Sequence, residues 1–473
     1  MHHIKRILLF FNLLNIFLIA VLLSCSPRTT DLTSNKPDEK TISNDSVNKA
    51  KEDKINVTDL KKEEESEVIY KGYNDSIFDE YIHTVLLYKS GWELSLPIIQ
   101  LGTNETLHLC FDRFDNGIRR YKYKVEHCDF NWESSGLSDN QFIDGFNDEY
   151  FDQYELSVNT IQSYVHYSVT FPKPTSKITK SGNYIIKVYE EGDEKNVVVI
   201  KRFMVIETIV NIDAYVKDAT DLMQKKYKQE IDFSINTLSN NFVNPSKNIK
   251  TVIIQNTRQD NKISNLKPRL IKGNLLDYDY DNENVFNGVN EFRNFDIKSL
   301  KFQSERIAAI TFDNRANHVY LHPDIGRRFK VYKTEDDING RFVIKKDISP
   351  KSNIEADYVF VHFTLQYEVP AIEGNIYVFG ELTDWKLTEE GKMKYNYKKK
   401  AYETTLFLKQ GYYNYWYVLF NEKDKKIDDT FVEGNHSETE NDYFIFVYYY
   451  DIMHGYWRLV GFRQLNSIKD RIK

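Results

Sequence analysis

Apolar and polar residues alternate in many short stretches after residue 69, and this pattern limits the possible folds more than any other feature of the chain. In KYKQEIDFSINT, Ile231, Phe233 and Ile235 share one face, and polar residues occupy the other. A period of two is typical of strands that bury one face in an antiparallel sheet. We predict further strands over DYVFVHFTL, GNYIIKVYEEGDE, NVVVIKRFMVIE and IVNIDAYV. No long helical pattern competes with them, so the sequence predicts an all-β protein made of tandem sandwiches.

The length of 473 residues allows about three domains of ordinary size. A strand pair that ends at Ile206 closes the first, and DISPKSNIEAD is typical of a linker before the third. We predict a signal peptide over 1–24, a disordered linker over 25–69, β-sandwiches over 70–207, 208–350 and 351–450, and a C-terminal tail over 451–473. Because this tail is too apolar for a free end, we expect it to pack on the folded body.

The N-terminus has the features of an export signal. Lys5 and Arg6 precede an apolar run over 7–23, and Leu-Leu-Ser stands directly before Cys25. A basic start, an apolar centre and small residues at the cleavage site describe a secretory signal peptide. Cys after Leu-Leu-Ser resembles the lipobox of bacterial lipoproteins, which implies that Cys25 is acylated and becomes the mature N-terminus. The alternative is an uncleaved membrane anchor, which two Asn residues within the run disfavour.

The next segment, residues 26–67, has almost no aromatic or clustered apolar residues and ends in DLKKEEESE. Such a composition cannot bury enough apolar surface to offset the entropy lost on ordering. We therefore predict a disordered tether, and a flexible chain of this length has an r.m.s. span of about 35 Å. A lipid at Cys25 would then hold the folded body near a membrane without pressing it against the surface.

Two further cysteines, Cys110 and Cys128, lie in LHLCFDRFDNGIRRYKYKVEHC. We interpret this segment as two paired strands joined by a turn at the Asn-Gly dipeptide of 116–117. In that hairpin the two cysteines would be offset by five residues, or roughly 17 Å along the strands. A disulfide needs a much closer approach. The sequence therefore predicts two buried free thiols.

Composition and motifs exclude several classes of function. The net charge is −7 and the pI is near 6.0, so the chain lacks the excess of positive charge that nucleic-acid binding requires. The sequence contains no Gly-x-Ser-x-Gly, His-Glu-x-x-His, Cys-x-x-Cys or phosphate-loop motif. We predict no enzymatic activity, no cofactor and no nucleic-acid partner.

One acidic stretch, DYDYDNEN, places Asp277, Asp279 and Asp281 two residues apart. The spacing matches the first ligands of an EF-hand loop, but the turn glycine and the final glutamate of that motif are missing. Three carboxylates on one face of a strand end repel one another unless a cation, an arginine or water offsets the repulsion. A calcium site is therefore the alternative to a solvated or arginine-paired loop, which is the default interpretation.

Residues 374–448 resemble a carbohydrate-binding module of the glycogen-binding type, which is an immunoglobulin-like β-sandwich. The resemblance rests on IYVFGELTDWK, AYETTLFLKQGYYNYWYVLF and ENDYFIFVYY, in which Trp385 matches the first stacking aromatic and Asn441 the late asparagine. The lysine of that family is Trp416 here, and NEKDKKIDD lacks the second stacking tryptophan. Sugar binding needs aromatic faces and convergent hydrogen bonds. Trp385 is therefore expected to be structural or in a protein contact, with Trp416 and Asn441 as further candidates for protein or glycan contact.

A wider resemblance covers residues 70–466. It rests on KVEHCDFNW, FIDGFNDEYFDQYELSVNTIQSYVHYSVTFP, GNLLDYDYDNENVFNGVNEFRNFDIKSL and YWRLVGFRQLNS, which occur in this order. Together they resemble the plug protein family of the Bacteroidetes type IX secretion system. The resemblance implies a non-enzymatic periplasmic β-protein that docks on the large outer-membrane translocon barrel and seals its pore while no cargo is engaged. A lipid at Cys25 would tether this protein to the outer membrane.

The alternative function is a lipid-anchored carbohydrate-binding protein that uses the C-terminal sandwich. For either function, Tyr residues are favoured anchors of protein interfaces. The clusters at 412–417 and 448–450 are therefore candidate contacts, although ordinary core and surface positions of strands explain any one of these tyrosines more simply.

Overall fold

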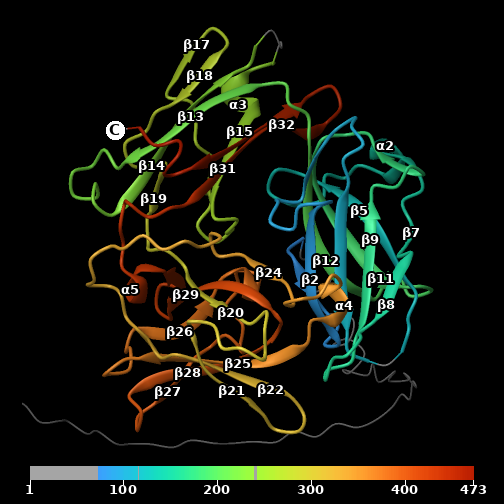
Figure 1. Cartoon of the computed structure of the whole chain (residues 1–473). Helices are drawn as coiled ribbons and strands as arrows, with labels where there is room; N and C mark the ends of the chain where they lie inside the picture. Colours follow the sequence, from blue (N-terminus) through green and yellow to red (C-terminus); the bar gives the residue numbers. More distant parts are fainter. Residues whose placement is uncertain (1–72, 116, 239–241, 473) are drawn as a thin grey trace, which may run out of the picture. The chain divides into compact units, whose positions relative to one another are not determined.

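Strands dominate the computed structural model, which describes residues 73–115, 117–238 and 242–472, all within one compact unit. The predicted all-β class is confirmed, because the strands form three sandwiches (Figure 1) and the helices of the described ranges are single turns. These turns are α2 (Asp139–Phe142), α3 (Pro245–Asn248), α4 (Ser352–Glu355), α5 (Thr430–Glu433) and η1 (Glu381–Thr383).

The first sandwich joins two sheets around one core. One sheet has the order β1-β12-β11-β5-β7 with β3 beside β12, and the other has the order β2-β4-β9-β8. A short pair, β6 and β10, lies beside them. The strands are β1 (Ser76–Ile77), β2 (Ile82–Lys89), β3 (Ile98–Gln100), β4 (Leu107–Arg113), β5 (Tyr121–Cys128), β6 (Ile143–Gly145), β7 (Glu149–Tyr150), β8 (Gln153–Leu156), β9 (Val165–Phe171), β10 (Ser176–Ile178), β11 (Gly182–Glu190) and β12 (Val197–Ile206).

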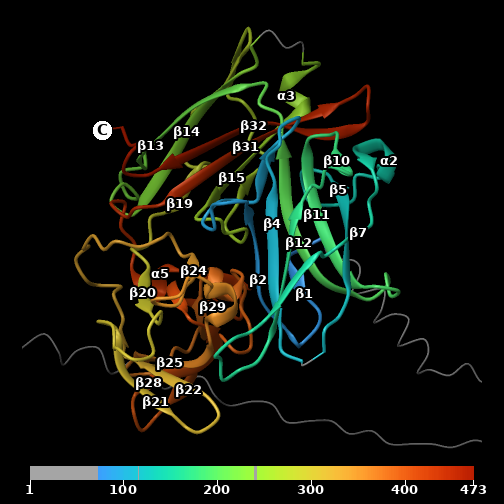
Figure 2. The same ribbon diagram turned by 45° about the vertical axis from the view of Figure 1, so that its right-hand side comes forward.

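The second sandwich is assembled from both ends of the remaining chain. One sheet has the order β13-β14-β18-β17 with β19 beside β14, and the other has the order β16-β15-β31-β32. Its strands are β13 (Asn211–Asp218), β14 (Lys228–Asn236), β15 (Ile249–Gln255), β16 (Ile263–Ser264), β17 (Leu270–Lys272), β18 (Leu275–Tyr278), β19 (Val285–Asn287), β31 (Asp442–Asp451) and β32 (Tyr456–Asn466). In Figures 1 and 2 the red β31 and β32 lie beside the green β15.

The third sandwich packs the sheet around β29 against the sheet around β25. Strand β29 pairs with β20, β24, β26 and β30, and the facing sheet has the order β21-β22-β25-β28-β27 with β23 beside β25. The pairs β22–β25, β23–β25 and β3–β12 are parallel, whereas the sequence predicted antiparallel sheets only. The strands are β20 (Arg293–Asp296), β21 (Ile307–Phe312), β22 (Asn317–Leu321), β23 (Asp324–Ile325), β24 (Phe342–Ile344), β25 (Tyr358–Gln366), β26 (Gly374–Phe379), β27 (Lys394–Asn396), β28 (Ala401–Lys409), β29 (Gly411–Asn421) and β30 (Lys426–Asp428).

This strand pairing departs from two predicted boundaries. Strand β31 pairs with β15 from Tyr443↔Gln255 to Tyr449↔Ile249, and β32 pairs with β31. The residues after 450 are therefore an edge strand of the second sandwich and not a tail packed on its outside. The boundary at 350 falls inside the third sandwich, because β20 and β24 both pair with β29. The third sandwich is thus an insertion between β19 and β31.

The predicted inward faces of the strands are confirmed. Ile231, Phe233 and Ile235 of β14 are buried and pack in one core with Ile445 and Val447 of β31. In β25, the inward residues fill the core of the third sandwich, and these are Val359, Val361, Phe363 and Leu365. Burial of such side chains contributes about 25 cal/mol per Å² of apolar surface. The local alternation therefore fixed which face of each strand turns inward.

The predicted hairpin at 116–117 is wrong, because β4 and β5 lie in different sheets. Strand β4 pairs with β2 and β9, and β5 pairs with β11 and β7. Crossing between the sheets brings Phe111 and Tyr121 together from opposite sides of the core, with ring centroids 5.2 Å apart. Each strand is paired with two other strands, and this ring contact packs their two sheets against each other.

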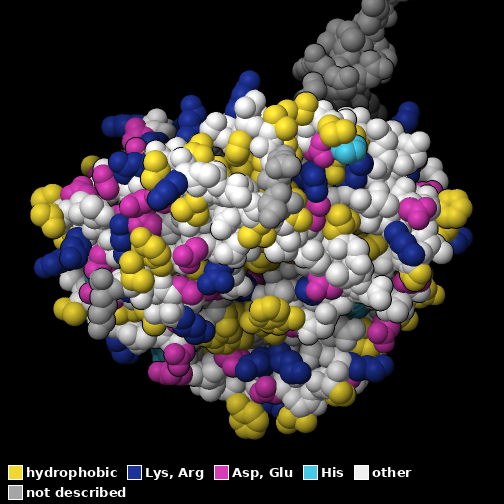
Figure 3. Space-filling view, turned by 90° about the horizontal axis from the view of Figure 1, so that it is seen from above, with side chains coloured by type: hydrophobic (Ala, Val, Ile, Leu, Met, Phe, Trp, Pro, Cys, Tyr) yellow, Lys and Arg dark blue, Asp and Glu magenta, His cyan; other side chains and the backbone are white. Residues whose placement is uncertain are grey.

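Hydrophobic side chains on the upper face of the molecule lie in small groups among Lys, Arg, Asp and Glu (Figure 3). The hairpin of β17 and β18 lies at the top of Figure 1, and Leu270, Ile271 and Leu275 of this hairpin are exposed. Within the described ranges, no helix is long and apolar enough to cross a membrane.

Both Cys110 and Cys128 are buried free thiols, and burial raises the pKa of each to about 12. Because the thiolate is the reactive form, we expect neither to react with a thiol reagent at pH 8 in the native protein. Both should react after unfolding without a reductant, as measured by absorbance titration. No reactive thiol in the unfolded chain would contradict the structure, and a third would mean that Cys25 carries no lipid.

Candidate functional site

The outer face of β4 carries a charged cluster at the junction of the first and third sandwiches. Leu107, Leu109 and Phe111 point into the core of the first sandwich, so Asp112 points the other way and is covered by the third sandwich. Its carboxylate accepts hydrogen bonds from Lys409 Nζ and from Tyr358 Oη, the latter at 2.6 Å. Burial is nearly complete, because the side chains of Asp112 and Lys409 are 1% and 2% exposed.

His166 completes this cluster. Its Nδ1–H donates to Asp112 Oδ1 at 2.7 Å, and Lys409 also donates to the carbonyl of Asn353 at 2.7 Å. Burial alone would raise the pKa of Asp112, but the charge of Lys409 and the hydrogen bond from His166 outweigh it and hold this pKa below its usual value. The carboxylate is therefore ionised at neutral pH and ties the two sandwiches together.

Similar pairs connect the other junctions. Between the second and third sandwiches, Arg258 lies 2.7 Å from Asp429. Between the first and second, Arg458 contacts Glu207 at 2.6 Å, and Tyr448 Oη donates to Asn183 at 2.9 Å. All three sandwiches are thus joined by hydrogen-bonded groups that are largely withdrawn from water, which gives each contact a defined geometry.

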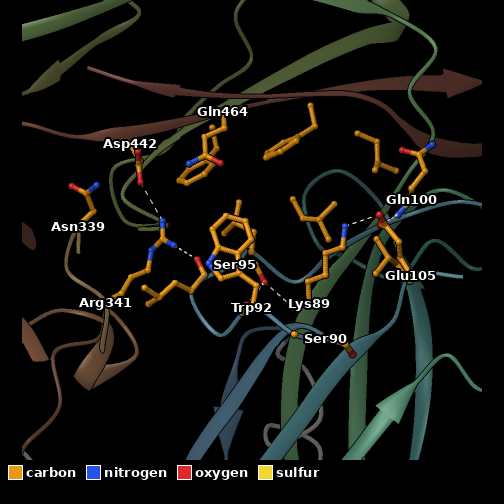
Figure 4. A pocket seen from close by; sticks show the side chains of 18 of the residues that line it. Lys89, Ser90, Trp92, Ser95, Gln100, Glu105, Asn339, Arg341, Asp442 and Gln464 are labelled. Atoms are coloured by element: carbon orange, nitrogen blue, oxygen red, sulfur yellow. Dashed lines mark hydrogen bonds and ion pairs between the residues drawn. The ribbon is translucent and has the colours of Figure 1, made fainter. Parts of the chain in front are cut away.

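One cleft, of about 630 Å³, opens between the first and second sandwiches (Figure 4). Trp92 is 60% exposed beside it. Arg341 from the third sandwich reaches Asp442 at 3.3 Å and also donates to the carbonyl of Leu94. On the other side, Lys89 pairs with Glu105 at 2.6 Å. The charged groups of this cleft are therefore paired with one another within the protein.

A second cleft, of about 560 Å³, touches all three sandwiches and includes Trp385 in its wall. Lys201 lies 2.8 Å from Asp384 and 3.3 Å from Asp75 in the same wall. Burial would lower the pKa of Lys201, but the two carboxylates outweigh burial and raise it above its usual value. The ammonium is therefore held charged between the two sandwiches that it joins.

Trp385 lies at the junction of the second and third sandwiches. Its Nε1 donates to Thr257 of the second sandwich at 3.0 Å, and its ring packs edge-on against Phe292 and Phe379. Asp384 and Trp385 both have a φ of 54°, in the left-handed region that is uncommon for residues other than glycine. The contacts to the second sandwich offset this backbone cost. Trp385 therefore packs within the third sandwich and hydrogen-bonds to the second.

Trp416 and Asn441 are fully buried and do not share a surface with Trp385. The Trp416 ring stacks on Phe292 with centroids 3.7 Å apart, and its Nε1 donates to the Asn290 carbonyl. Asn441 donates to Gln229 and Gly288 and accepts from Asn256. Neither side chain is open to a protein or a glycan in this structure.

Two of the three aspartates in the acidic stretch, Asp279 and Asp281, lie within 4 Å of a cation. Asp279 lies with the buried Glu230 and Asp232 of β14, and their carboxylate oxygens are close enough together to hold a metal ion. However, Lys217 Nζ lies 2.5 Å from Asp232 and 3.0 Å from Glu230, so the lysine ammonium already supplies the positive charge that a metal ion would bring to these carboxylates. Asp281 faces Arg269 at 3.9 Å, and Asp277 is paired in register with Ser234. The three predicted aspartates do not converge on one point.

Most tyrosines of the two predicted clusters are buried in the cores of the sandwiches. Tyr413, Tyr415 and Tyr417 of β29 and Tyr448 of β31 are buried. Cys25, the signal peptide and the linker lie outside the described residues. The junction residues Asp112 and Lys409 escaped the sequence analysis, although a charged residue inside an apolar strand such as LHLCFDR was a usable signal.

Comparison with known proteins places this architecture in a family. A family model described as the type 9 secretion system plug protein 1st domain matches residues 82–207, which hold the first sandwich except its short strand β1. A crystal structure of a hypothetical protein from Parabacteroides merdae is 33% identical, with a TM-score of 0.80, and the match covers 83% of this chain and 99% of that one. The chain belongs to the type IX secretion system plug protein family.

Membership of the plug protein family connects the chain with type IX secretion and with the cell envelope. The expectation from the sequence motifs is confirmed at the level of the family. No curated protein matches the chain. A DNA-bound alkylpurine DNA glycosylase AlkC from Pseudomonas fluorescens is 10% identical over 26% of this chain and 29% of its own, and its TM-score of 0.15 is too low to support any argument.

Removing one partner of the buried ion pair between Asp112 and Lys409 should lower the stability of the folded protein. We expect Lys409→Met to lower the free energy of unfolding by about 3–5 kcal/mol, because it leaves the Asp112 carboxylate buried without its cation. Asp112→Asn in the same chain should recover part of the loss. Urea denaturation followed by fluorescence measures both. Lys399→Met is the matched control, because Lys399 pairs with Glu403 at the surface and should change stability by less than about 0.5 kcal/mol.

The lowered pKa of Asp112 determines the pH range in which its ion pair with Lys409 stabilises the fold. A carboxylate with a lowered folded pKa stabilises the protein above its unfolded pKa of about 3.9, and this stability is lost as the pH falls through the folded value. The difference between wild type and Lys409→Met should therefore shrink below about pH 4. A difference that grew on acidification would contradict the assignment.

Trp385→Ala should cost stability and leave glycan affinity unchanged. We expect a loss of about 3 kcal/mol, the lower end for removing a packed aromatic ring. Trp92→Ala, which removes a more exposed ring, should cost less than about 1 kcal/mol. Electrophoresis in gels that contain glycogen would show a glycan site. Retardation of the wild type that Trp385→Ala abolishes while the variant stays folded would restore the carbohydrate-binding alternative.

Proposed function

We propose that the chain is a non-enzymatic periplasmic plug that docks on the outer-membrane translocon barrel of the type IX secretion system and seals its pore while no cargo is engaged. The observation that carries the proposal is the match of the first sandwich to the plug family. The third sandwich is joined to it by the buried pair of Asp112 and Lys409, and the second by the partly buried pair of Glu207 and Arg458, so both act as extensions of one body.

Stiffness is what a plug needs. A pore lid that bends at its domain junctions would lose conformational entropy on docking and would leave gaps through which solutes pass. Each sandwich of this chain is tied to both others by at least one hydrogen-bonded pair or buried side chain. The body can therefore present one fixed surface to a partner.

The same contacts favour a role without catalysis. Two fully buried carboxylates, Asp112 and Glu433, accept hydrogen bonds from Lys409 and from Arg293 and Arg327. A general acid or base must exchange protons with a substrate, and these groups are committed to internal partners. Their positions are explained by the assembly of the body.

In the proposal, the lipid at Cys25 and the linker of 25–69 keep the plug at the periplasmic side of the outer membrane. Tethering makes docking effectively intramolecular and raises the local concentration of the plug to the millimolar range when the linker spans the distance. The plug could then leave the pore during transport and return without being lost.

A deletion strain tests sealing. We expect cells that lack the chain to admit large dyes through open translocons, and the wild-type gene to restore exclusion. A Cys25→Ala gene, matched in expression, should restore exclusion less well, because the local concentration falls without the tether. Unchanged dye entry in the deletion strain, measured by cell fluorescence, would overturn the plug function.

A separate experiment tests docking. Tagged protein purified from solubilised outer membranes should bring down a very large β-barrel, identified by mass spectrometry. The buried-pair variant Lys409→Met should recover less of it at equal expression. Recovery of no barrel by the folded wild-type chain would contradict the proposed partner, even if the dye experiment gave a phenotype.

A further inference from the structure

Five apolar side chains project into solvent from three loops of the third sandwich, and together they are called the apolar loop patch. They are Phe329, Val331, Val369, Ile372 and Tyr397. Phe329 and Val331 are each 93% exposed and Ile372 is 94% exposed, so these rings and methyl groups have almost no protein contact. Scattered exposed residues need no explanation, but such projecting groups on adjacent loops do.

The three loops are in mutual contact. The guanidinium of Arg328 lies 5.4 Å from the rings of both Phe329 and Phe431, and Phe431 stacks on Tyr367 with centroids 6.1 Å apart. Tyr395 then donates to the Tyr367 carbonyl at 2.8 Å. These contacts connect the loop after β23 with the loop that follows β25 and with β27.

The turn between β27 and β28 completes the patch. The ring of Tyr397 packs edge-on against Tyr395 with centroids 5.0 Å apart. On the neighbouring loop, the Ala371 amide donates to Tyr402 of β28 at 2.7 Å, which places Val369 and Ile372 beside the same turn. The apolar loop patch is thus one continuous edge of the third sandwich.

Positive charge surrounds this edge. The segments 328–333, 367–373 and 394–400 contain seven Lys or Arg and two Glu, a net charge of +5, although the whole chain carries −7. Among the described residues, Arg328, Lys330 and Lys398 have no carboxylate within ion-pair distance. Of the acidic residues that follow, Asp337 turns inward, where its carboxylate accepts from the Phe292 amide, and Glu335 pairs with Lys333 at 3.4 Å.

We infer that the apolar loop patch inserts into the head-group region of an anionic phospholipid bilayer. Aliphatic and aromatic side chains at loop tips enter the interface between head groups and acyl chains, while flanking Lys and Arg attract anionic lipid phosphates. A protein partner would bury a broader and flatter surface with fewer cations at its centre. The inference goes beyond docking on the translocon, because it assigns one edge of the body to the membrane around the translocon.

Bromine-labelled lipids test this contact even when a lipid anchor already holds the protein on the vesicle. Phe329→Trp and Ile372→Trp each add one fluorophore at the patch, and Leu222→Trp and Met453→Trp add one at equally exposed positions of the second sandwich. The full chain is mixed with vesicles of phosphatidylethanolamine and brominated phosphatidylglycerol. We expect strong quenching of the added fluorescence at 329 and 372, and none at 222 and 453.

A variant with two carboxylates in place of apolar patch residues provides the second readout. In a full chain that carries Cys25→Ala and so has no lipid anchor, Phe329→Glu with Ile372→Glu should weaken sedimentation with these vesicles about tenfold, and added salt should also weaken the binding of the Cys25→Ala chain with an intact patch. Leu222→Glu with Met453→Glu should have no effect. Vesicles of phosphatidylcholine alone should bind less protein, because they lack net negative charge.

Several results would overturn the inference. One is a vesicle-bound protein in which the patch positions stay unquenched, and another is quenching at positions 222 and 453 to the same extent. Protection of the patch from iodide by the purified translocon, without quenching by brominated lipid, would assign the edge to the protein partner instead. The dye-exclusion and pull-down experiments do not depend on this outcome.

Discussion

Strand β15 meets its partner β31 only after the whole third sandwich has been inserted between them in the sequence. Because the entropy cost of closing a loop grows slowly with its length, such an insertion is tolerated when the closing contact buries enough apolar surface. Here Ile253 of β15 joins Ile445 and Val447 of β31 in the core of the second sandwich. The two connections to the inserted sandwich also hydrogen-bond to each other, through the His436 amide and the Val289 carbonyl. The inserted sandwich is thus held by two adjacent connections instead of one.

The buried charges at the junctions add what apolar packing alone does not supply. Replacing a buried ion pair by apolar residues often leaves stability unchanged, so the pair of Asp112 and Lys409 is weak evidence for extra stability. Its effect is on geometry, because an uncompensated carboxylate would be costly at any other relative position of the two sandwiches. Lys201 with Asp384, and Arg258 with Asp429, impose the same condition at other junctions. Together, these buried ion pairs favour a single relative arrangement of the three sandwiches.

Local pattern and distant pairing differ in what the sequence reveals. The inward face of β14 follows from residues two apart, and the structure agrees with it. The choice of partner for β4 depends on residues far along the chain, so the Asn-Gly dipeptide misled the prediction of a hairpin. Pairing between distant segments also explains why the predicted boundaries at 350 and 450 differ from the structure. No local sequence signal indicates that β31 returns to pair with β15. At the site, Asn441 matched a sugar-binding motif and Trp416 stood where that motif has a lysine, but the burial of both depends on packing against Phe292 and Asn256.

A stiff body and a flexible tether are complementary for a lid that must leave and return. Stiffness lowers the entropy lost when the lid docks, and the predicted tether limits the volume that the lid searches after release. Neither property sets the orientation in which the lid meets the pore. An edge that prefers the membrane surface would restrict that orientation, because the third sandwich would then stay against the bilayer while the other two remain free to reach the barrel. Docking would become a search over the membrane plane instead of over all rotations, which raises the chance that each encounter closes the pore.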